Sequence, residues 1–329
     1  RAKIKALLEA LKEKYTVFAP ILKNGTVVFD RMEDVESVQL HFSNTVHSPK
    51  ALFFPQTEQL LSQIEDGWKE NLPPEENSIL FGLRPCDARG IGLLDKVFSG
   101  DDFEDPYYLI RREKSLIVSL ACQHPRMSCF CSSLNSGPHA EEAADIILFE
   151  TSDAYLLKAL SDKGEQLVKE VSGLLSKPKA SDQGELEKQK KAAEKKLATS
   201  FKLDKLDKKL GENFEHQTWD EIHEKCLGCG ACTYLCPTCH CFDIIDEANC
   251  RIRSWDSCQF CLFTLHASGH NPRPAGREKM RQRIMHKFSY CPDNFDETFC
   301  VGCGRCIQCC PVNFDIRSVV NGLAEELES

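Results

Sequence analysis

Two stretches decide how this chain is interpreted: CLGCGACTYLCP at 226–237 and CVGCGRCIQCCP at 300–311. Both follow the spacing C-x2-C-x2-C-x3-C-P, which holds a [4Fe–4S] cluster in iron–sulfur proteins. Three thiolates spaced in this way lie on one tight loop and can bind three corners of a cubane. Glycines at 228, 230, 302 and 304 permit the close turn and leave backbone N–H groups available to the sulfur atoms. The sequence therefore predicts two cluster-binding loops.

The fourth Cys of each run follows three residues later and points away from its own loop. In two-cluster ferredoxins this Cys binds the cluster of the other run. We therefore predict cluster one on Cys226, Cys229, Cys232 and Cys310, and cluster two on Cys300, Cys303, Cys306 and Cys236. Structural zinc is the main alternative, but zinc sites usually show two separate C-x-x-C pairs rather than a triple.

Composition places these motifs in an ordinary globular chain. It has 329 residues, of which 42% are hydrophobic and 28% charged, and this length suggests about two domains. No apolar run approaches the roughly 18 to 20 residues that span a bilayer. The net charge of −9 argues against nucleic acid as the main partner. The first residues have the pattern of an amphipathic helix rather than a signal peptide, and the initial Arg suggests that the natural N-terminus lies upstream.

The distribution of Cys also separates metal binding from a disulfide scaffold. All 19 Cys follow residue 85, and 15 of them lie between Cys226 and Cys310. Disulfide scaffolds are instead short, secreted and crosslinked throughout. We therefore expect a reducing compartment, the cytoplasm, and no membrane insertion.

Residues 1–175 show the alternation of strands and helices that is typical of an α/β domain. Apolar runs predict buried strands at 78–83, 115–122 and 145–151, and Asn24-Gly25 predicts a hairpin turn. Helical spacing predicts helices at 55–66 and 154–164. Asp87 is expected to cap the helix that follows the first buried strand.

Four Cys of this domain follow the carboxyl ends of the predicted strands, where α/β sheets bind ligands. They are Cys86, Cys122, Cys129 and Cys131. These thiols could hold a third [4Fe–4S] cluster that faces the positive end of the helix after Cys86. Their spacing is less specific than the two loops above, and a set of buried, inert thiols is the alternative.

The rest of the chain divides into a connector and a metal-binding domain. Residues 176–215 are highly charged and predict an exposed helical connector. Residues 216–329 predict a two-cluster ferredoxin-like domain with a long insert at 238–299, so the predicted fold class is mixed α+β with an N-terminal α/β domain. A further metal site in the insert, or plain thiol packing, would involve Cys239, Cys241, Cys258 and Cys261. A basic run in the insert could neutralise the clusters or bind an acidic partner; it comprises Arg273, Arg277, Lys279, Arg281, Arg283, His286 and Lys287.

Several motifs taken together resemble one family, which contains the iron–sulfur beta subunit of soluble sulfhydrogenases and the iron–sulfur subunit of anaerobic sulfite reductase. The resemblance runs from about residue 80 to 318 and includes RPCD (84–87), CFCSSLNSGP (129–138), CPTCHCFDI (236–244), WDSC (255–258), GHNPRP (269–274), RQRIMHKFSY (281–290) and CVGCGRCIQCCPVNFDIR (300–317). Because Cys86, Cys122, Cys129 and Cys131 belong to the shared motifs, the resemblance also favours the third cluster. Cys261, Cys291 and Cys309 depart from the family pattern.

The resemblance implies an electron-transfer protein that links a flavoprotein subunit to a catalytic subunit of hydrogenase or sulfite reductase type, with a soluble ferredoxin as a further partner. No G-x-G-x-x-G motif indicates a dinucleotide site, and no nucleophile–base set indicates a catalytic residue. Two alternatives stay open. In one, the N-terminal domain binds flavin or substrate and carries out the chemistry. In the other, the chain is a metal-stabilised redox-sensing or docking module.

Overall fold

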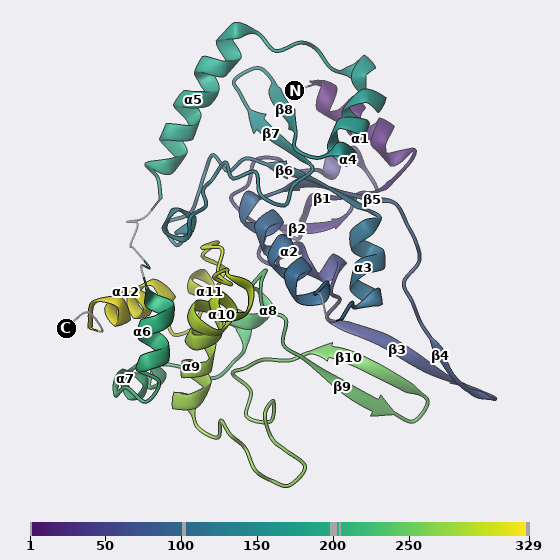
Figure 1. The fold of residues 1–329 in the computed structure, drawn as a ribbon. Helices are drawn as coiled ribbons and strands as arrows, with labels where there is room; N and C mark the ends of the chain where they lie inside the picture. The colour runs from purple at the N-terminus through teal and green to yellow at the C-terminus, as the bar shows by residue number, and fades with distance from the viewer. Residues whose placement is uncertain (1, 101–102, 198–202, 204, 327–329) are drawn as a thin grey trace.

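A six-stranded sheet forms the N-terminal half of the computed structural model, which describes residues 2–100, 103–197, 203 and 205–326 (Figure 1). In sheet order its strands are β2 (Thr26–Arg31), β1 (Thr16–Lys23), β5 (Ser78–Leu83), β6 (Ser115–Leu120), β7 (Ile146–Glu150) and β8 (Tyr155–Ala159). The four central strands are parallel, and β2 and β8 pair antiparallel at the edges. The predicted Asn24-Gly25 turn is confirmed, with φ of 50° and 75° at these residues.

Helices cover both faces of this sheet (Figure 1). Residues of β5 enter different cores on the two faces: Ile79 and Phe81 pack with the helices on one face, and Leu80 packs with those on the other. Leu83 joins Leu80 because the strand is irregular between Phe81 and Leu83. The first face carries α1 (Ala2–Lys12) and α4 (Asp162–Glu170), and the second carries α2 (Pro85–Phe98) and α3 (Pro106–Glu113). Burial on both faces explains why the central strands are almost continuously apolar.

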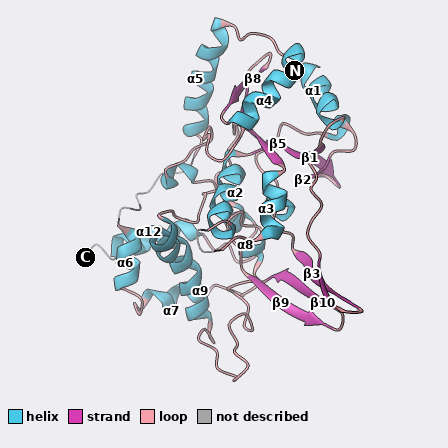
Figure 2. Ribbon diagram, turned by 45° about the vertical axis from the view of Figure 1, so that its right-hand side comes forward, coloured by secondary structure: helices cyan, strands magenta, loops and turns pink. Residues whose placement is uncertain are grey.

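A second, antiparallel sheet joins distant parts of the chain (Figure 2). Its order is β4 (Gly67–Glu70), β3 (Thr57–Ile64), β10 (Cys250–Trp255) and β9 (Phe242–Glu247). Arg253 of β10 forms a buried ion pair with Glu58 of β3 at 2.6 Å. The N-terminal half and the insert therefore share one sheet.

Two of the predicted helices are wrong. Residues 55–66 contain strand β3, and residues 154–164 contain strand β8 and only the first turn of α4. In the second case the helix starts late because the Ser161 side chain accepts a hydrogen bond from the Gly164 N–H and caps it there. In both segments the helical spacing of Leu residues is overridden by pairing with neighbouring strands.

The C-terminal part is built mainly from short helices around a core of its own. They are α6 (Leu206–Glu212), α7 (Thr218–His223), α8 (Ala231–Tyr234), α9 (Gly276–Met285), a π-helical turn (His286–Tyr290), α10 (Cys291–Phe295), α11 (Arg305–Gln308) and α12 (Ile316–Glu326). Short 3-10 turns occur at Val35–Ser37, Pro49–Leu52, Cys131–Leu134 and Ser172–Leu174. Among the described helices none is long and apolar enough to cross a membrane.

The predicted connector has two different halves. Helix α5 (Ala180–Glu194) is largely exposed and lies apart from the C-terminal helices (Figure 1). Helix α6 instead buries Leu206 and Leu210 against Trp219 in the C-terminal core. Only the first half therefore matches the expectation of a solvent-exposed connector.

Candidate metal centres

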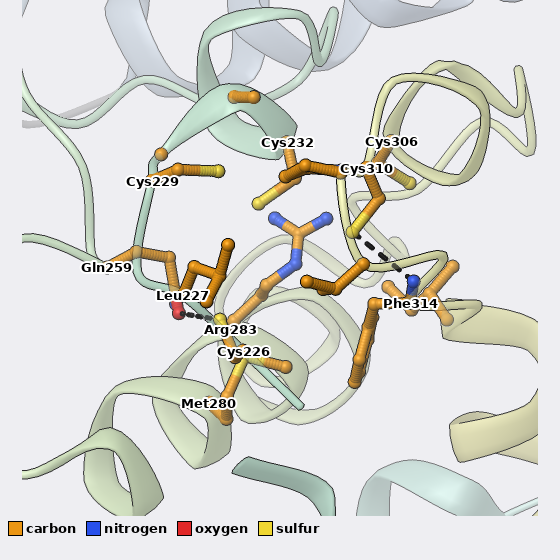
Figure 3. A pocket seen from close by; sticks show the side chains of 15 residues that line it. Cys226, Leu227, Cys229, Cys232, Gln259, Met280, Arg283, Cys306, Cys310 and Phe314 are labelled. Atoms are coloured by element: carbon orange, nitrogen blue, oxygen red, sulfur yellow. Dashed lines mark hydrogen bonds between the residues drawn. The ribbon is translucent and has the colours of Figure 1, made fainter. Parts of the chain in front are cut away.

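The loop at 226–232 and the later Cys310 line one cavity (Figure 3). Gly228 and Gly230 have φ of 66° and 72°, the left-handed conformation that glycine adopts without strain. Backbone N–H groups point at the sulfur atoms, with Gly228 donating to Cys226 Sγ at 3.4 Å and Phe314 donating to Cys310 Sγ at 3.2 Å. The four thiols predicted for cluster one, Cys226, Cys229, Cys232 and Cys310, are thus brought together.

The thiols predicted for cluster two lie deeper. Cys300 and Cys303 are buried, whereas Cys229 of the first loop is exposed. Burial raises the pKa of Cys306 well above its ordinary value, and Arg283 opposes this shift. The nearby thiols of Cys300, Cys303 and Cys236 add to it. The thiols of the second set are thus close enough to disfavour one another's charge, and two of the four are buried.

The four N-terminal Cys line a third cavity, at the carboxyl ends of β5 and β6. Its lining includes Cys86, Cys122, Cys129 and Cys131, together with Arg84, Gly302 and Cys303. Burial is the main cause that raises the pKa of Cys129 to about 11 and of Cys131 to about 12. These thiols would become thiolates only on coordination to a metal centre, such as the iron atoms of a cluster.

The third cavity lies directly against the cluster-two loop. The Phe130 N–H donates to the Gly302 carbonyl at 2.9 Å, and Asn44 Nδ2 donates to the Cys303 carbonyl at 2.9 Å. A Cβ on Gly302 would lie 2.5 Å from the Cys131 backbone nitrogen, so only glycine permits this approach. Cys303 lines the third cavity, and Cys306 of the same loop lines the first. The three thiol sets therefore lie in series, with the cluster-two set in the middle.

Comparison with known proteins supports the two ferredoxin-motif loops. Residues 225–314 match the 4Fe-4S dicluster domain family. The chain is 34% identical over 325 residues to the sulfhydrogenase 2 subunit beta of Pyrococcus furiosus, covering 96% of this chain and 95% of that protein. The chain belongs to the sulfhydrogenase beta subunit family. No solved structure matches it.

The side chains around the thiols fit anionic iron–sulfur clusters. Lys287 is 4% exposed, and its Nζ lies 3.4 Å from Cys236 Sγ. Burial disfavours its charge, yet the thiols of Cys236, Cys239 and Cys300 hold the pKa of Lys287 well above its ordinary value. In the third cavity, buried Arg84 donates to the Ala121 carbonyl at 2.8 Å and leaves its Nε without a partner among the described residues. Uncompensated buried cations are costly, so an anionic group beside them is expected.

Two of the predicted thiol sets are spread around cavities. Zinc binds thiolates at about 2.3 Å from one point. Among the described residues, no group of three or more Cys, His, Asp or Glu is arranged to hold such an ion. All 19 Cys are free thiols in the structure. Sulfurs spread around a cavity are what a cubane requires.

A buried ion pair connects the two metal-binding halves and corrects one prediction. Asp87 does not cap α2: the cap position is Arg84, with Pro85 as the first helical residue. The Asp87 carboxylate instead accepts two hydrogen bonds from Arg305, at 2.7 and 2.8 Å. Because Asp87 follows Cys86 and Arg305 precedes Cys306, the pair lies between the third cavity and the cluster-two loop.

The insert thiols fall into separate contacts. Cys241 lies beside Cys258, whereas Cys239 lies beside Cys236, a predicted ligand of cluster two. Cys261 is exposed and lies 3.1 Å from Lys279 Nζ. A metal site on Cys239, Cys241, Cys258 and Cys261 stays a prediction.

Sequence reasoning selected thiols that line the cavities but missed the polar groups beside them. Asn44 and Arg84 carry no local pattern that indicates a role, although Arg84 stands inside the RPCD motif. The basic run is predicted to lie beside the clusters. Two of its members instead form ion pairs within the chain: Arg277 and Arg281 both pair with Glu215 of the connector.

Proposed function

We propose that this chain relays single electrons through three [4Fe–4S] clusters between a flavoprotein subunit and a catalytic redox subunit, with a soluble ferredoxin as a further partner. When bound, such clusters supply one-electron transfer at potentials that the surrounding protein sets. The predicted ligands are the two ferredoxin-motif sets and, for the third cluster, Cys86, Cys122, Cys129 and Cys131. The family relationship to a sulfhydrogenase beta subunit supports this role.

The observation that carries the proposal is the serial arrangement of the three thiol sets. Cys303 belongs to the middle set and lines the third cavity, and Cys306 belongs to the middle set and lines the first. Shared lining residues keep neighbouring sites close, as a relay requires. At one end Cys229 and Leu227 are exposed, and beside the third cavity Met127 is 84% exposed. A series with a buried middle and accessible ends suits a conduit better than a reaction site.

The protein's own contribution is to hold the thiolates, exclude water and supply compensating charge. Cys300, Cys303 and Val301 are buried, so the middle set is shielded from solvent. Backbone N–H groups and Lys287 point at sulfur and stabilise negative charge there. No substrate chemistry is assigned to these residues; the catalytic reaction belongs to a partner.

Iron and acid-labile sulfide per chain, measured on anaerobically purified protein, test the proposal. Three clusters give about 12 irons per chain. Cys129→Ser should lose about four irons and one set of spectroscopic features, and Cys303→Ser a different set. Cys250→Ser, outside the predicted ligand sets, serves as the control. About eight irons in the wild type, unchanged in Cys129→Ser, would refute the third cluster, and stoichiometric flavin in the purified chain would favour a flavin-binding reductase.

A further inference from the structure

One buried cation is placed where it faces two of the three thiol sets. Arg283 of α9 is 3% exposed, and its guanidinium points into the cavity that the cluster-one thiols line (Figure 3). The same cavity is lined by Cys232, a predicted ligand of cluster one, and by Cys306, a predicted ligand of cluster two. Arg283 thus lies between the two ferredoxin-motif sites.

Among the described residues Arg283 forms no ion pair with a carboxylate, in contrast to other arginines of its helix. Its neighbours on the same helix, Arg277 and Arg281, both pair with Glu215. Arg283 instead has a buried Nη1 that finds no hydrogen-bond partner within the described part of the chain. A guanidinium cannot lose its proton in a protein, so its charge must be balanced by something else in the cavity. The groups that favour its charged form are thiols, so the balancing charge is expected on sulfur.

We propose that Arg283 is a positioning residue whose single buried charge raises the reduction potentials of cluster one and cluster two together. The inference rests on the proposed function and adds to it a residue that raises the potentials of two neighbouring sites together. Reduction adds negative charge to a cluster, so a fixed cation nearby favours the reduced state. Because one charge faces thiols of both sets, its removal should affect both clusters in the same direction.

Lys287 offers the contrasting case. Its Nζ contacts Cys236 Sγ at 3.4 Å, and its other close thiols include Cys300, so both belong to cluster two. Lys287 should therefore influence mainly that cluster. Arg283 should affect both clusters and Lys287 only one, and this difference makes the inference testable.

The experiment is a redox titration of the full chain, followed by electron paramagnetic resonance, on wild type, Arg283→Gln and Arg283→Lys. Arg277→Gln is the matched control, since it removes an ion-paired arginine from the same helix. In Arg283→Gln, the ratio of reduced to oxidised cluster at a fixed potential should fall at least tenfold for both clusters. For a one-electron couple this fall corresponds to a shift of about 59 mV. Arg283→Lys keeps the charge and should keep wild-type values, and Lys287→Gln should shift cluster two alone.

The outcomes separate this inference from the proposed function. The wild type is titrated first: fewer than two reducible four-iron clusters in the ferredoxin-motif sites would overturn the proposed function itself. With both clusters present, unchanged potentials in Arg283→Gln, or a shift of only one cluster, overturns the role of Arg283. If Arg283→Gln loses iron, Arg283→Met and Arg283→Lys are compared instead. Lower potentials in the Met variant support the inference, and equal potentials in the two overturn it.

Discussion

Removal of the Asp87 carboxylate should destabilise the protein strongly. Asp87 and Arg305 are 3% and 1% exposed, and two hydrogen bonds of 2.7 and 2.8 Å join them. Asp87→Ala would leave the Arg305 charge buried, with only hydrogen bonds to Thr45 remaining among the described residues. Breaking a buried pair in this way typically costs about 3–5 kcal/mol. The expected result is a loss of that size in the free energy of unfolding.

The measurement is urea unfolding of the iron-loaded protein under anaerobic conditions, with iron content checked in each variant. Asp246→Ala is the matched control, because Arg251 holds Asp246 in a similar two-bonded geometry at the exposed surface. Exposed pairs contribute little, so this control should stay near the wild type. The double variant Asp87→Leu with Arg305→Leu should recover much of the loss, since it removes both buried charges. Equal stability of Asp87→Ala and Asp246→Ala would refute the reasoning.

Two further substitutions test the packing around the sites. Gly302 has φ of 63°, and the Cβ of Gly302→Ala would lie 2.5 Å from the Cys131 nitrogen, so we expect this variant to lose iron from the third site. The control is Gly25→Ala: Gly25 has φ of 75°, but no atom lies within 4 Å of the added Cβ, so this variant should keep its full iron content. Iron retained equally in both would contradict the close approach of the loops.

His139 stacks on Phe149, and mainly its burial lowers the pKa of its ring to about 4 from 6.5. Its neutral form therefore stabilises the fold above about pH 6.5, and this contribution, about 2 kcal/mol after allowance for partial exposure, is lost as pH falls toward 4. Urea unfolding at pH 7 and pH 5 should show less pH dependence in His139→Phe than in wild type or in the exposed-site control His270→Gln.

The parts of the site that the sequence predicted are those encoded by local spacing. The two ferredoxin runs could be recognised because their ligands lie within a few residues of one another and their glycines must take positive φ. Asp87 shows the opposite case. Its position near a helix start favoured a capping role, but its partner, Arg305, lies 218 residues away, and no local pattern indicates that contact.

The same limit explains the wrong helix at 55–66. Its Leu60-Leu61 pair fits a helical face, whereas the observed strand β3 is held between β4 and β10. Strand β10 begins at Cys250, far along the chain, and no propensity rule in the first segment could anticipate it. Contacts between distant segments therefore determine both the second sheet and the Asp87–Arg305 ion pair. Local spacing was enough only to recognise the Cys of each ferredoxin run.

Several buried cationic side chains of this protein lie beside the predicted cluster thiols, and this placement links folding to metal binding. Arg84 lies at the third cavity, Arg305 between that cavity and the middle set, and Lys287 and Arg283 at the ferredoxin-motif sets. Of these, only Arg305 forms an ion pair with a carboxylate among the described residues. The other three keep a desolvation cost that hydrogen bonds to neutral groups offset only in part. Bound clusters would supply the missing negative charge, so cluster loading should stabilise the interface where the N-terminal sheet meets the C-terminal helices.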